Sequence, residues 1–233
     1  MGPVALCADA TAAWHASWLT ALGLRSERRD SVWRALDSPP FIYWTAITLA
    51  PDAPASTVSD AHGTICDSWS QLDLAPFRFV ERVREPWFVR PAGALPHAQG
   101  PLDLEIVRVS TAAEVAEFED VSARGFGGED ASLATGTMHP ASILADARMT
   151  MLTGRVGGNA VAAATTYRTE TAVGIYGVTT IASARGRGYA SALTRALIDP
   201  AAPAVLSPSP EAESLYRRLG FEPVGELRQW QRP

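Results

Sequence analysis

The spacing of apolar residues predicts that the N-terminal part of the chain mixes helices and strands. Trp14, Trp18, Leu19 and Leu22 recur at helical intervals, which predicts a helix over residues 11–24. Aromatic and β-branched runs bounded by Pro, Gly and Asp predict strands after this helix. The strands are expected over residues 31–36, 41–49, 69–74, 77–83 and 87–90, with a second helix over residues 55–65.

A second series of helices and strands begins at residue 104. Thr111 and Glu114 form a Ser/Thr-x-x-Glu capping box, which predicts the start of a helix. Short turns at residues 157–159 and 169–170 separate apolar runs and favour antiparallel hairpins. The expected order is a strand over 104–109, helices over 111–123 and 131–147, strands over 149–156, 161–168 and 171–181, a helix over 188–198, a strand near Val205, a helix over 211–219 and strands over 221–231. This order is an α+β pattern.

A stretch rich in Pro and Gly, over residues 91–101, separates the two series of helices and strands. It has no apolar period, which is typical of a connector between domains. The expected division is a first domain over residues 1–91, a linker over residues 92–102 and a second domain over residues 103–233. One similarity crosses this division, because residues 77–84 resemble residues 221–228 in the spacing of an aromatic residue, a Val, an aliphatic residue and an Arg. Such a similarity is compatible with a degenerate repeat.

Composition and charge exclude several classes of site. All 20 basic residues are Arg, so the chain has no phosphate-binding loop of the GxxxxGK[ST] type, no kinase-type Lys and no Lys for a Schiff base with pyridoxal phosphate. The net charge of -5 provides no general basic field. Neither a nucleic acid nor a membrane is therefore an expected partner.

Cysteine and histidine usage argues against a metal site. Cys7 and Cys66 are the only cysteines, and the four histidines are scattered without the spacing of metal ligands. We expect no metal, no disulfide framework and a reducing, cytoplasmic location. The first residues lack the basic start and unbroken apolar core of a signal peptide, and no apolar stretch reaches the roughly 18 residues of a membrane span.

The segment over residues 177–193 carries the strongest chemical signal. It reads as a strand that passes through a Gly-rich turn into an amphipathic helix. Gly186 and Gly188 lack Cβ atoms, so backbone N–H groups can approach an anion, and the helix adds the positive end of its dipole. Such charge-assisted bonds contribute about 1.5 to 3 kcal/mol each, against about 0.3 to 1 kcal/mol for the dipole. Arg185 and Arg187 add cationic donors suited to a pyrophosphate, and the alternative is an ordinary turn with two solvated arginines.

A later segment completes a recognisable pattern of two motifs. The first is Gln/Arg-x-x-Gly-x-Gly/Ala, matched by Arg185, Gly188 and Ala190. The second is an Ala followed by Leu-Tyr-x-x-x-Gly-Phe, matched by Ala212, Leu215, Tyr216, Gly220 and Phe221. In order and spacing the two motifs resemble the GNAT superfamily of CoA-dependent N-acyltransferases, over about residues 104–233.

This resemblance implies a GNAT-like fold, with a mixed, splayed central sheet flanked by helices and a divergent, degenerate GNAT-like domain in front of it. It implies acetyl-CoA, or another acyl-CoA, as co-substrate, with its pantetheine arm along the fourth strand and its pyrophosphate in the Gly-rich turn. Tyr216 stands where the family's general acid protonates the departing thiolate, and a phenol with a pKa near 10 can donate that proton. Packing is the alternative role for this side chain. The implied cofactor-binding residues are Val178, Thr179, Thr180, Arg185, Gly186, Arg187, Gly188, Tyr189, Ala190 and Ser209.

Two features depart from the family pattern. Ser209 stands where members usually have Asn, and residues 171–180 contain no carboxylate, although members often place a general base on this strand. The identity of the base therefore stays open. The alternatives are Tyr176, a water relayed to Glu129 or Asp130, an amine that arrives neutral, and Glu119 or Asp120, for which a solvated helix face is the simpler explanation.

The remaining expectations concern the acceptor and the reaction. Phe126, Met138, Tyr167 and Tyr176 are expected on the acceptor side, with ordinary core packing as the alternative. We expect an enzyme that moves an acetyl group from acetyl-CoA to a primary amine of a small molecule, by direct attack in a ternary complex, as a monomer or homodimer. A non-catalytic acyl-CoA binding or sensing protein, or a GNAT-fold enzyme with other acyl-CoA chemistry, is the alternative.

Overall fold

The computed structural model describes residues 1–232, and the chain divides into two compact units. The first unit contains Met1–Arg90 and the chain from Val205 onward, whereas the second unit contains Pro91–Ala204. The first unit therefore combines the two ends of the chain. Its boundary at residue 90 lies close to the expected linker, but the residues from 205 onward group with the N-terminal residues.

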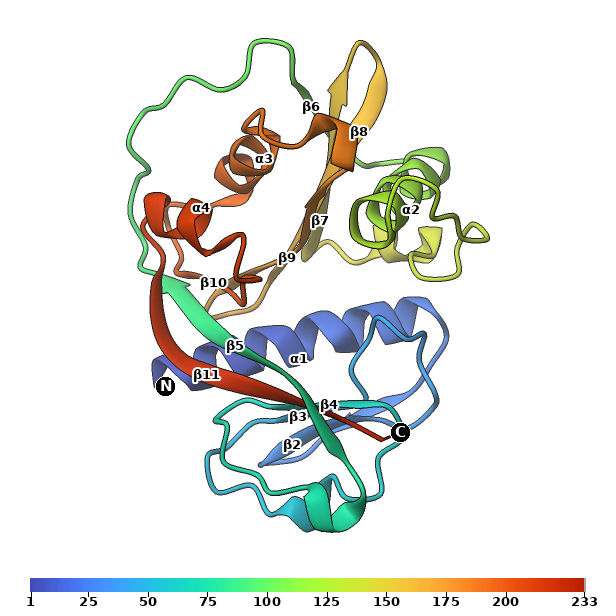
Figure 1. Ribbon diagram of the computed structural model, residues 1–233, viewed down its shortest axis with the longest axis vertical. Helices are drawn as coiled ribbons and strands as arrows, with labels where there is room; N and C mark the ends of the chain where they lie inside the picture. Colours follow the sequence, from blue (N-terminus) through green and yellow to red (C-terminus); the bar gives the residue numbers. More distant parts are fainter. Residues whose placement is uncertain (233) are drawn as a thin grey trace. The chain divides into compact units, whose positions relative to one another are not determined.

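The first unit is a sheet with one long helix. Its elements are α1 (Pro3–Ala21), β1 (Ser26–Arg28), β2 (Val32–Ala35), β3 (Ala46–Thr48), η1 (Ala55–Thr57), β4 (Thr64–Asp67), η2 (Ala75–Phe77), β5 (Val80–Arg90), α4 (Glu213–Arg218) and β11 (Glu222–Gln231) (Figure 1). The strand order is β1-β2-β3-β4-β11-β5. Only the β3–β4 pair is parallel among these neighbours. Helix α1 packs on β5 and β11 and buries Cys7, Trp18 and Leu19.

Two elements expected in this unit are wrong. The helix over residues 55–65 is only the short turn η1 followed by β4, because Gly63, with a φ of 105°, does not continue a helix. The strand over residues 69–74 is irregular, because Ser70 has a φ of 59° and the Asp67 carboxylate accepts a hydrogen bond from the Leu72 N–H at 2.8 Å. A side chain thus takes the place of a strand partner in this segment.

Three other boundaries in the first unit differ from expectation. Helix α1 begins at Pro3, well before residue 11, with Pro at the first helical position, where its missing N–H has no helical partner to lose. The strand expected over residues 41–49 is reduced to β3. Strand β5 begins at Val80 because Arg78, with a φ of 65°, interrupts the extended backbone.

The second unit is an antiparallel sheet with a helix on each face. Its elements are β6 (Glu105–Arg108), α2 (Ala112–Gly127), η3 (Ala141–Ala145), β7 (Met149–Val156), β8 (Asn159–Arg168), β9 (Val173–Thr180), η4 (Ala182–Ala184) and α3 (Tyr189–Leu197), in the strand order β9-β8-β7-β6. Helices α2 and α3 both pack against β8 and β9, on opposite faces of the sheet (Figure 1). Strand β10 (Ala204–Leu206) crosses the division between the units.

Several local predictions for this unit are confirmed. Val156 lies opposite Asn159 across a two-residue turn, in which Gly157 and Gly158 have φ values of 56° and 82°. The capping box is present, because the Glu114 N–H donates to Thr111 Oγ1 at 3.3 Å and the Thr111 N–H donates to Glu114 Oε2 at 3.0 Å. These features need only residues that are close in sequence.

The helix expected over residues 131–147 is wrong. The segment is irregular apart from the short turn η3, and Gly136 within it has a φ of 79°. Pro140 precedes η3 in an extended conformation. Backbone N–H groups of this segment bond to the Glu119 side chain of α2 instead of to carbonyls of their own helix.

The two segments that are similar in sequence are hydrogen-bonded neighbours in the first unit. Strands β5 and β11 pair antiparallel, with Arg84 opposite Arg228. Glu85 lies opposite Leu227, and Val83 lies opposite Gln229. A half-turn about the Arg84–Arg228 pair therefore brings each segment onto the position of the other. The two segments are related by a local twofold axis.

Residues 1–232 carry neither a membrane-spanning helix nor a cluster of metal ligands. Within that range no helix combines the length and the apolar character needed to cross a membrane. The same residues contain no group of three or more His, Cys, Asp or Glu side chains that could hold a metal ion. Cys7 and Cys66 are both buried and free of disulfide bonds.

Candidate functional site

The loop between β9 and α3 presents backbone N–H groups at the surface of the second unit. Gly186 and Gly188 have φ values of 79° and 84°, which other residues rarely adopt, and residues 185–188 are all exposed. Gly188 caps α3, whose first bond runs from the Ala192 N–H to the Gly188 oxygen at 3.0 Å. Within the described chain, the N–H groups of residues 186–191 have no hydrogen-bond acceptor. Unpaired amides at the start of a helix form an anion-binding site.

Arg185 fixes this loop to the body of the unit. Its Nε donates to the Thr180 oxygen at 3.1 Å, and its terminal nitrogen donates to the Gly125 oxygen in the last turn of α2 at 2.8 Å. Its backbone N–H donates to the Ala182 oxygen at 3.3 Å. The guanidinium is therefore bonded to two carbonyls, in contrast to the expectation of a phosphate donor, which leaves Arg187 as the arginine of the loop for an anion.

Strand β9 carries a β-bulge before the loop. Gly177 and Val178 together oppose Ala164 of β8, and Gly177 has a φ of 61°. This is the geometry of a bulge whose first residue is a left-handed glycine, and such bulges concentrate next to functional sites. Gly177 begins the segment singled out from the sequence but was not predicted to form a bulge, although an isolated Gly in a strand pattern is a signal for one.

Glu129 lies against the entry to the loop. Its carboxylate accepts a hydrogen bond from the Ser183 N–H at 2.6 Å. The Ser183 side-chain hydroxyl lowers the pKa of Glu129 most, and the bond from the Ser183 N–H lowers it further, because both stabilise the ionised form. A carboxylate with a lowered pKa is a weaker base, so this geometry favours an anchoring role for Glu129 over proton transfer.

Glu119 is a buried carboxylate, contrary to the expectation of a solvated helix face. Its side chain is on α2, and the residue is 2% exposed. It accepts hydrogen bonds from the backbone N–H groups of Gly136, Met138 and His139, at 2.6, 2.7 and 2.9 Å. These bonds hold the irregular segment after α2 and occupy most of the acceptor capacity of the carboxylate. Glu119 is thus an anchor for that segment and is poorly available as a base.

The residues expected on the acceptor side have different surroundings. Phe126 is 68% exposed, whereas Met138 and Tyr167 are buried. The Tyr167 hydroxyl donates to Asp146 Oδ2 at 3.3 Å, and Tyr176 is half-buried on β9. Their proposed role toward an acceptor stays a prediction.

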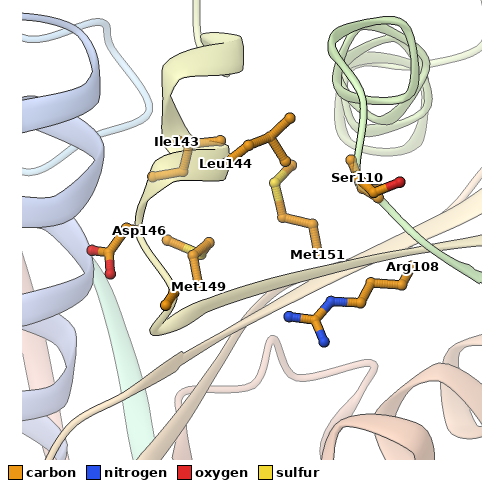
Figure 2. A pocket seen from close by; sticks show the side chains of 9 residues that line it. Arg108, Ser110, Ile143, Leu144, Asp146, Met149 and Met151 are labelled. Carbon is orange, nitrogen blue, oxygen red and sulfur yellow. The ribbon is translucent and has the colours of Figure 1, made fainter.

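A cavity of about 210 Å³ lies beside β6, η3 and β7 (Figure 2). Six of its nine lining residues are apolar, two of them methionines, and one arginine and one aspartate add charge. None of the four residues expected on the acceptor side lines it. The lining residues are Arg108, Val109, Ser110, Ile143, Leu144, Asp146, Ala147, Met149 and Met151.

Tyr216 lies on α4 in the first unit. It is 6% exposed, and its ring meets Phe221 edge to face with centroids 5.8 Å apart. The Phe221 N–H donates to the Tyr216 oxygen at 3.1 Å, and the Gly220 N–H donates to the Arg217 oxygen at 3.0 Å. With Gly220 at a φ of 84°, these two bonds form a Schellman motif at the end of α4. The way this helix ends therefore explains why the second motif contains Gly220 followed by Phe221.

Comparison with known protein families gives the same assignment as the two motifs. The model of the acetyltransferase (GNAT) family matches residues 117–221 of the chain. These residues form a GNAT acetyltransferase domain. The GNAT domain includes most of α2, the Gly-rich loop with α3, and α4 with Tyr216. No curated protein matches the chain.

Solved structures extend the similarity beyond the GNAT domain. A GCN5-related N-acetyltransferase from Kribbella flavida has a TM-score of 0.66 and 19% identity, over 96% of this chain and 95% of that chain. A GNAT-family protein from Novosphingobium aromaticivorans DSM 12444 has a TM-score of 0.59 and 19% identity, over 93% of this chain and 97% of that chain. A conserved protein of unknown function from Staphylococcus epidermidis ATCC 12228 has a TM-score of 0.55 and 15% identity, over 85% of this chain and 82% of that chain. At these identities the similarity shows the fold, which is GNAT-like, with a mixed open sheet flanked by helices.

Proposed function

We propose that this protein transfers an acetyl group from acetyl-CoA to a primary amine of a small molecule. The observation that carries the proposal is the row of N–H groups at residues 186–191, without an acceptor in the described chain, which begins at the exposed residues 186–188 and lies inside a GNAT acetyltransferase domain. These amides match the chemistry of a pyrophosphate, which is anionic and rich in acceptor oxygens. The amine attacks the thioester directly in a ternary complex.

The proposed cofactor site uses backbone atoms more than side chains. The amides of Gly186, Arg187, Gly188, Tyr189 and Ala190 would hold the pyrophosphate, and the Arg187 guanidinium would add a charged donor. The Tyr189 hydroxyl donates to Asp103 at 2.6 Å, so only its backbone is available to the ligand. Each such amide bond contributes about 1.5 to 3 kcal/mol.

The pantetheine arm would bond to the backbone of the strand that precedes the loop. Val178, Thr179 and Thr180 follow directly after the bulge at Gly177. Ser209 would contact the cofactor at the position where related proteins carry Asn. We propose Tyr216 as the acid that protonates the CoA thiolate when the C–S bond breaks.

Two glycine variants provide a matched test of the cofactor site. Gly188→Asp should abolish acetyl-CoA binding, with a loss of at least about 100-fold measured by isothermal titration calorimetry, because a carboxylate would face the phosphates. Gly158→Asp is the control, since Gly158 is also exposed, has a φ of 82° and lies in the β7–β8 turn. Equal binding by both variants would remove the loop from the cofactor site.

Turnover separates the proposed enzyme from a binding protein. Thiol release from acetyl-CoA should depend on added amine in an assay with a panel of primary amines, and mass spectrometry of the product should give the mass of the acetylated amine. Acetyl-CoA binding without turnover on any amine would instead favour a sensor. Thiol release with a different product would indicate other acyl-CoA chemistry.

A further inference from the structure

The connector, residues 91–104, runs past α3 to β6 (Figure 1). Near the end of α3, Arg195 donates a hydrogen bond to the Pro96 oxygen at 2.9 Å. At the start of α3, Pro101 lies beside Gly188, since a Cβ atom on Gly188 would be 3.6 Å from Pro101 Cγ. The connector therefore follows α3 along its length and reaches the loop between β9 and α3. The connector, the loop and α3 all belong to the second unit.

Asp103 joins the connector to the first turn of α3. The Tyr189 hydroxyl donates to Asp103 Oδ2 at 2.6 Å, a length typical of a charge-assisted bond between a hydroxyl and a carboxylate. Tyr189 is 2% exposed, whereas Asp103 is exposed. A buried hydroxyl requires a hydrogen-bond partner, and here a carboxylate of the connector provides it.

Arg187 contacts the same hydroxyl from the loop. The bond to Asp103 raises the pKa of Tyr189 most, because it stabilises the protonated phenol, and a hydrogen bond from the Arg187 side chain offsets part of this rise. Arg187 is exposed and is the arginine of the loop that is left for an anion. A carboxylate, a phenol and a guanidinium thus follow one another at the start of α3.

The first turn of α3 has no cap of its own. Its N-cap residue is Gly188, and a glycine has no side chain that could accept a hydrogen bond from the first amides of the helix. The helix has nine residues, and a helix of this length depends on tertiary contacts for its stability. The bond between Tyr189 and Asp103 holds the first turn from outside the helix.

We propose that Asp103 is a positioning residue for the cofactor and acts through Tyr189. This inference rests on the proposed acetyl-CoA site at residues 186–191. The bond holds the backbone of Tyr189, whose amide lies within that site, and restrains Arg187 beside it. Without the bond, the binding arrangement would be populated for only part of the time, and the apparent Kd would rise by the inverse of that fraction. The connector is thus part of the cofactor site.

Charge and position predict opposite effects for Asp103. If its negative charge repelled the phosphates of acetyl-CoA, removal of that charge should tighten binding. If its acceptor oxygen holds Tyr189, removal of that oxygen should weaken binding. Asparagine keeps an acceptor oxygen without the charge, whereas alanine has neither. The two variants Asp103→Asn and Asp103→Ala therefore separate the two effects.

Isothermal titration calorimetry with acetyl-CoA measures the effect without a known acceptor. Asp103→Ala and Tyr189→Phe should each raise the Kd by about tenfold, as expected if the binding arrangement is populated for about a tenth of the time. The stoichiometry should stay unchanged, whereas a loss of fold would lower the stoichiometry and leave the Kd of the folded molecules unaltered. Asp103→Asn should stay within about threefold, because a neutral acceptor weakens the bond but keeps it.

Glu105→Ala is the matched control. Glu105 is an exposed carboxylate on β6, two residues after Asp103. Its replacement removes the same charge from the same part of the chain and should change neither the Kd nor the stoichiometry.

The double variant of Asp103→Ala with Tyr189→Phe tests whether the two side chains act as a pair. Its Kd should equal that of either single variant, because both changes remove the same bond. Losses that multiply to about 100-fold would mean that the side chains act independently and would overturn the inference. An unchanged Kd in Asp103→Ala, or tighter binding by both Asp103 variants, would also overturn it and leave the proposed function standing. Failure of the unmodified protein to bind acetyl-CoA would overturn both proposals.

Discussion

At the residue scale, burial and hydrogen bonding decide the chemistry of each carboxylate and imidazole. Glu119 accepts hydrogen bonds from three backbone N–H groups, whereas Glu85 has only two neutral donors. The sequence names all candidate acids but does not say which of them are buried. Spacing along a helix or strand defines one face of that element, and only the packed neighbours decide whether the face meets water.

His15 and His139 give the first prediction at this scale. Burial lowers the pKa of each to about 4, from an ordinary value of 6.5. The unfolded chain therefore binds protons that the folded chain excludes between about pH 6.5 and 4, so stability is complete above this window and falls as pH drops through it. Each histidine should contribute a loss of about 2 kcal/mol between pH 7 and pH 5.

Urea unfolding at several pH values checks this expectation. His15→Phe keeps an aromatic ring against Trp44, which stacks on His15 with ring centroids 5.0 Å apart, and should remove about half of the pH dependence. His97→Gln is the control, because His97 is exposed and its replacement should leave the slope unchanged. A slope that is identical in all three proteins would contradict the assignment to His15.

Tyr216→Phe is the second prediction at the residue scale. The ring can keep its packing against Phe221, so the fold and acetyl-CoA affinity should change little. Loss of the phenolic proton should lower kcat by about tenfold or more, since general acid catalysis contributes at least that much. An unchanged rate, measured as thiol release at saturating acetyl-CoA, would remove Tyr216 from the acid role.

At the element scale, the predicted elements that the structure confirms are those completed by residues nearby in sequence. The capping box of α2, the turn at Gly157 and Gly158, and the helix end at Gly220 each use bonds within a few residues. The predicted helices over residues 55–65 and 131–147 failed. In the second of these, amides bond to Glu119, which is distant in sequence, and that alternative is invisible in a local pattern.

At the scale of the whole molecule, the first unit takes its sheet from both ends of the chain. Strand β11 lies between β4 and β5, and the similar segments around Arg84 and Arg228 face each other in it. Any two antiparallel strands are related in this way, so the degenerate repeat stays a prediction. The pairing of β11 with β4 and β5 explains why the linker does not separate two independent sheets.

A fragment of residues 103–233 tests this arrangement. Both sheet partners of β11 precede residue 91, so the fragment would leave two long edges of β11 unpaired. We expect it to aggregate or to lack a cooperative thermal transition, and co-expression with residues 1–102 should restore a soluble complex. A fragment that unfolds cooperatively by itself, compared with the full chain under the same conditions, would support the expected division at residue 103.

The sequence by itself determined the α+β pattern, the strand, Gly-rich turn and helix of the candidate cofactor loop, and the GNAT resemblance, because these depend on residues within a few turns of one another. Only the tertiary structure decided that Arg185 bonds to carbonyls, that Glu119 anchors a segment and that Glu85 lies beside Ser207. These relations join residues far apart along the chain. Their proximity arises from sheet pairing and packing, which local spacing does not specify.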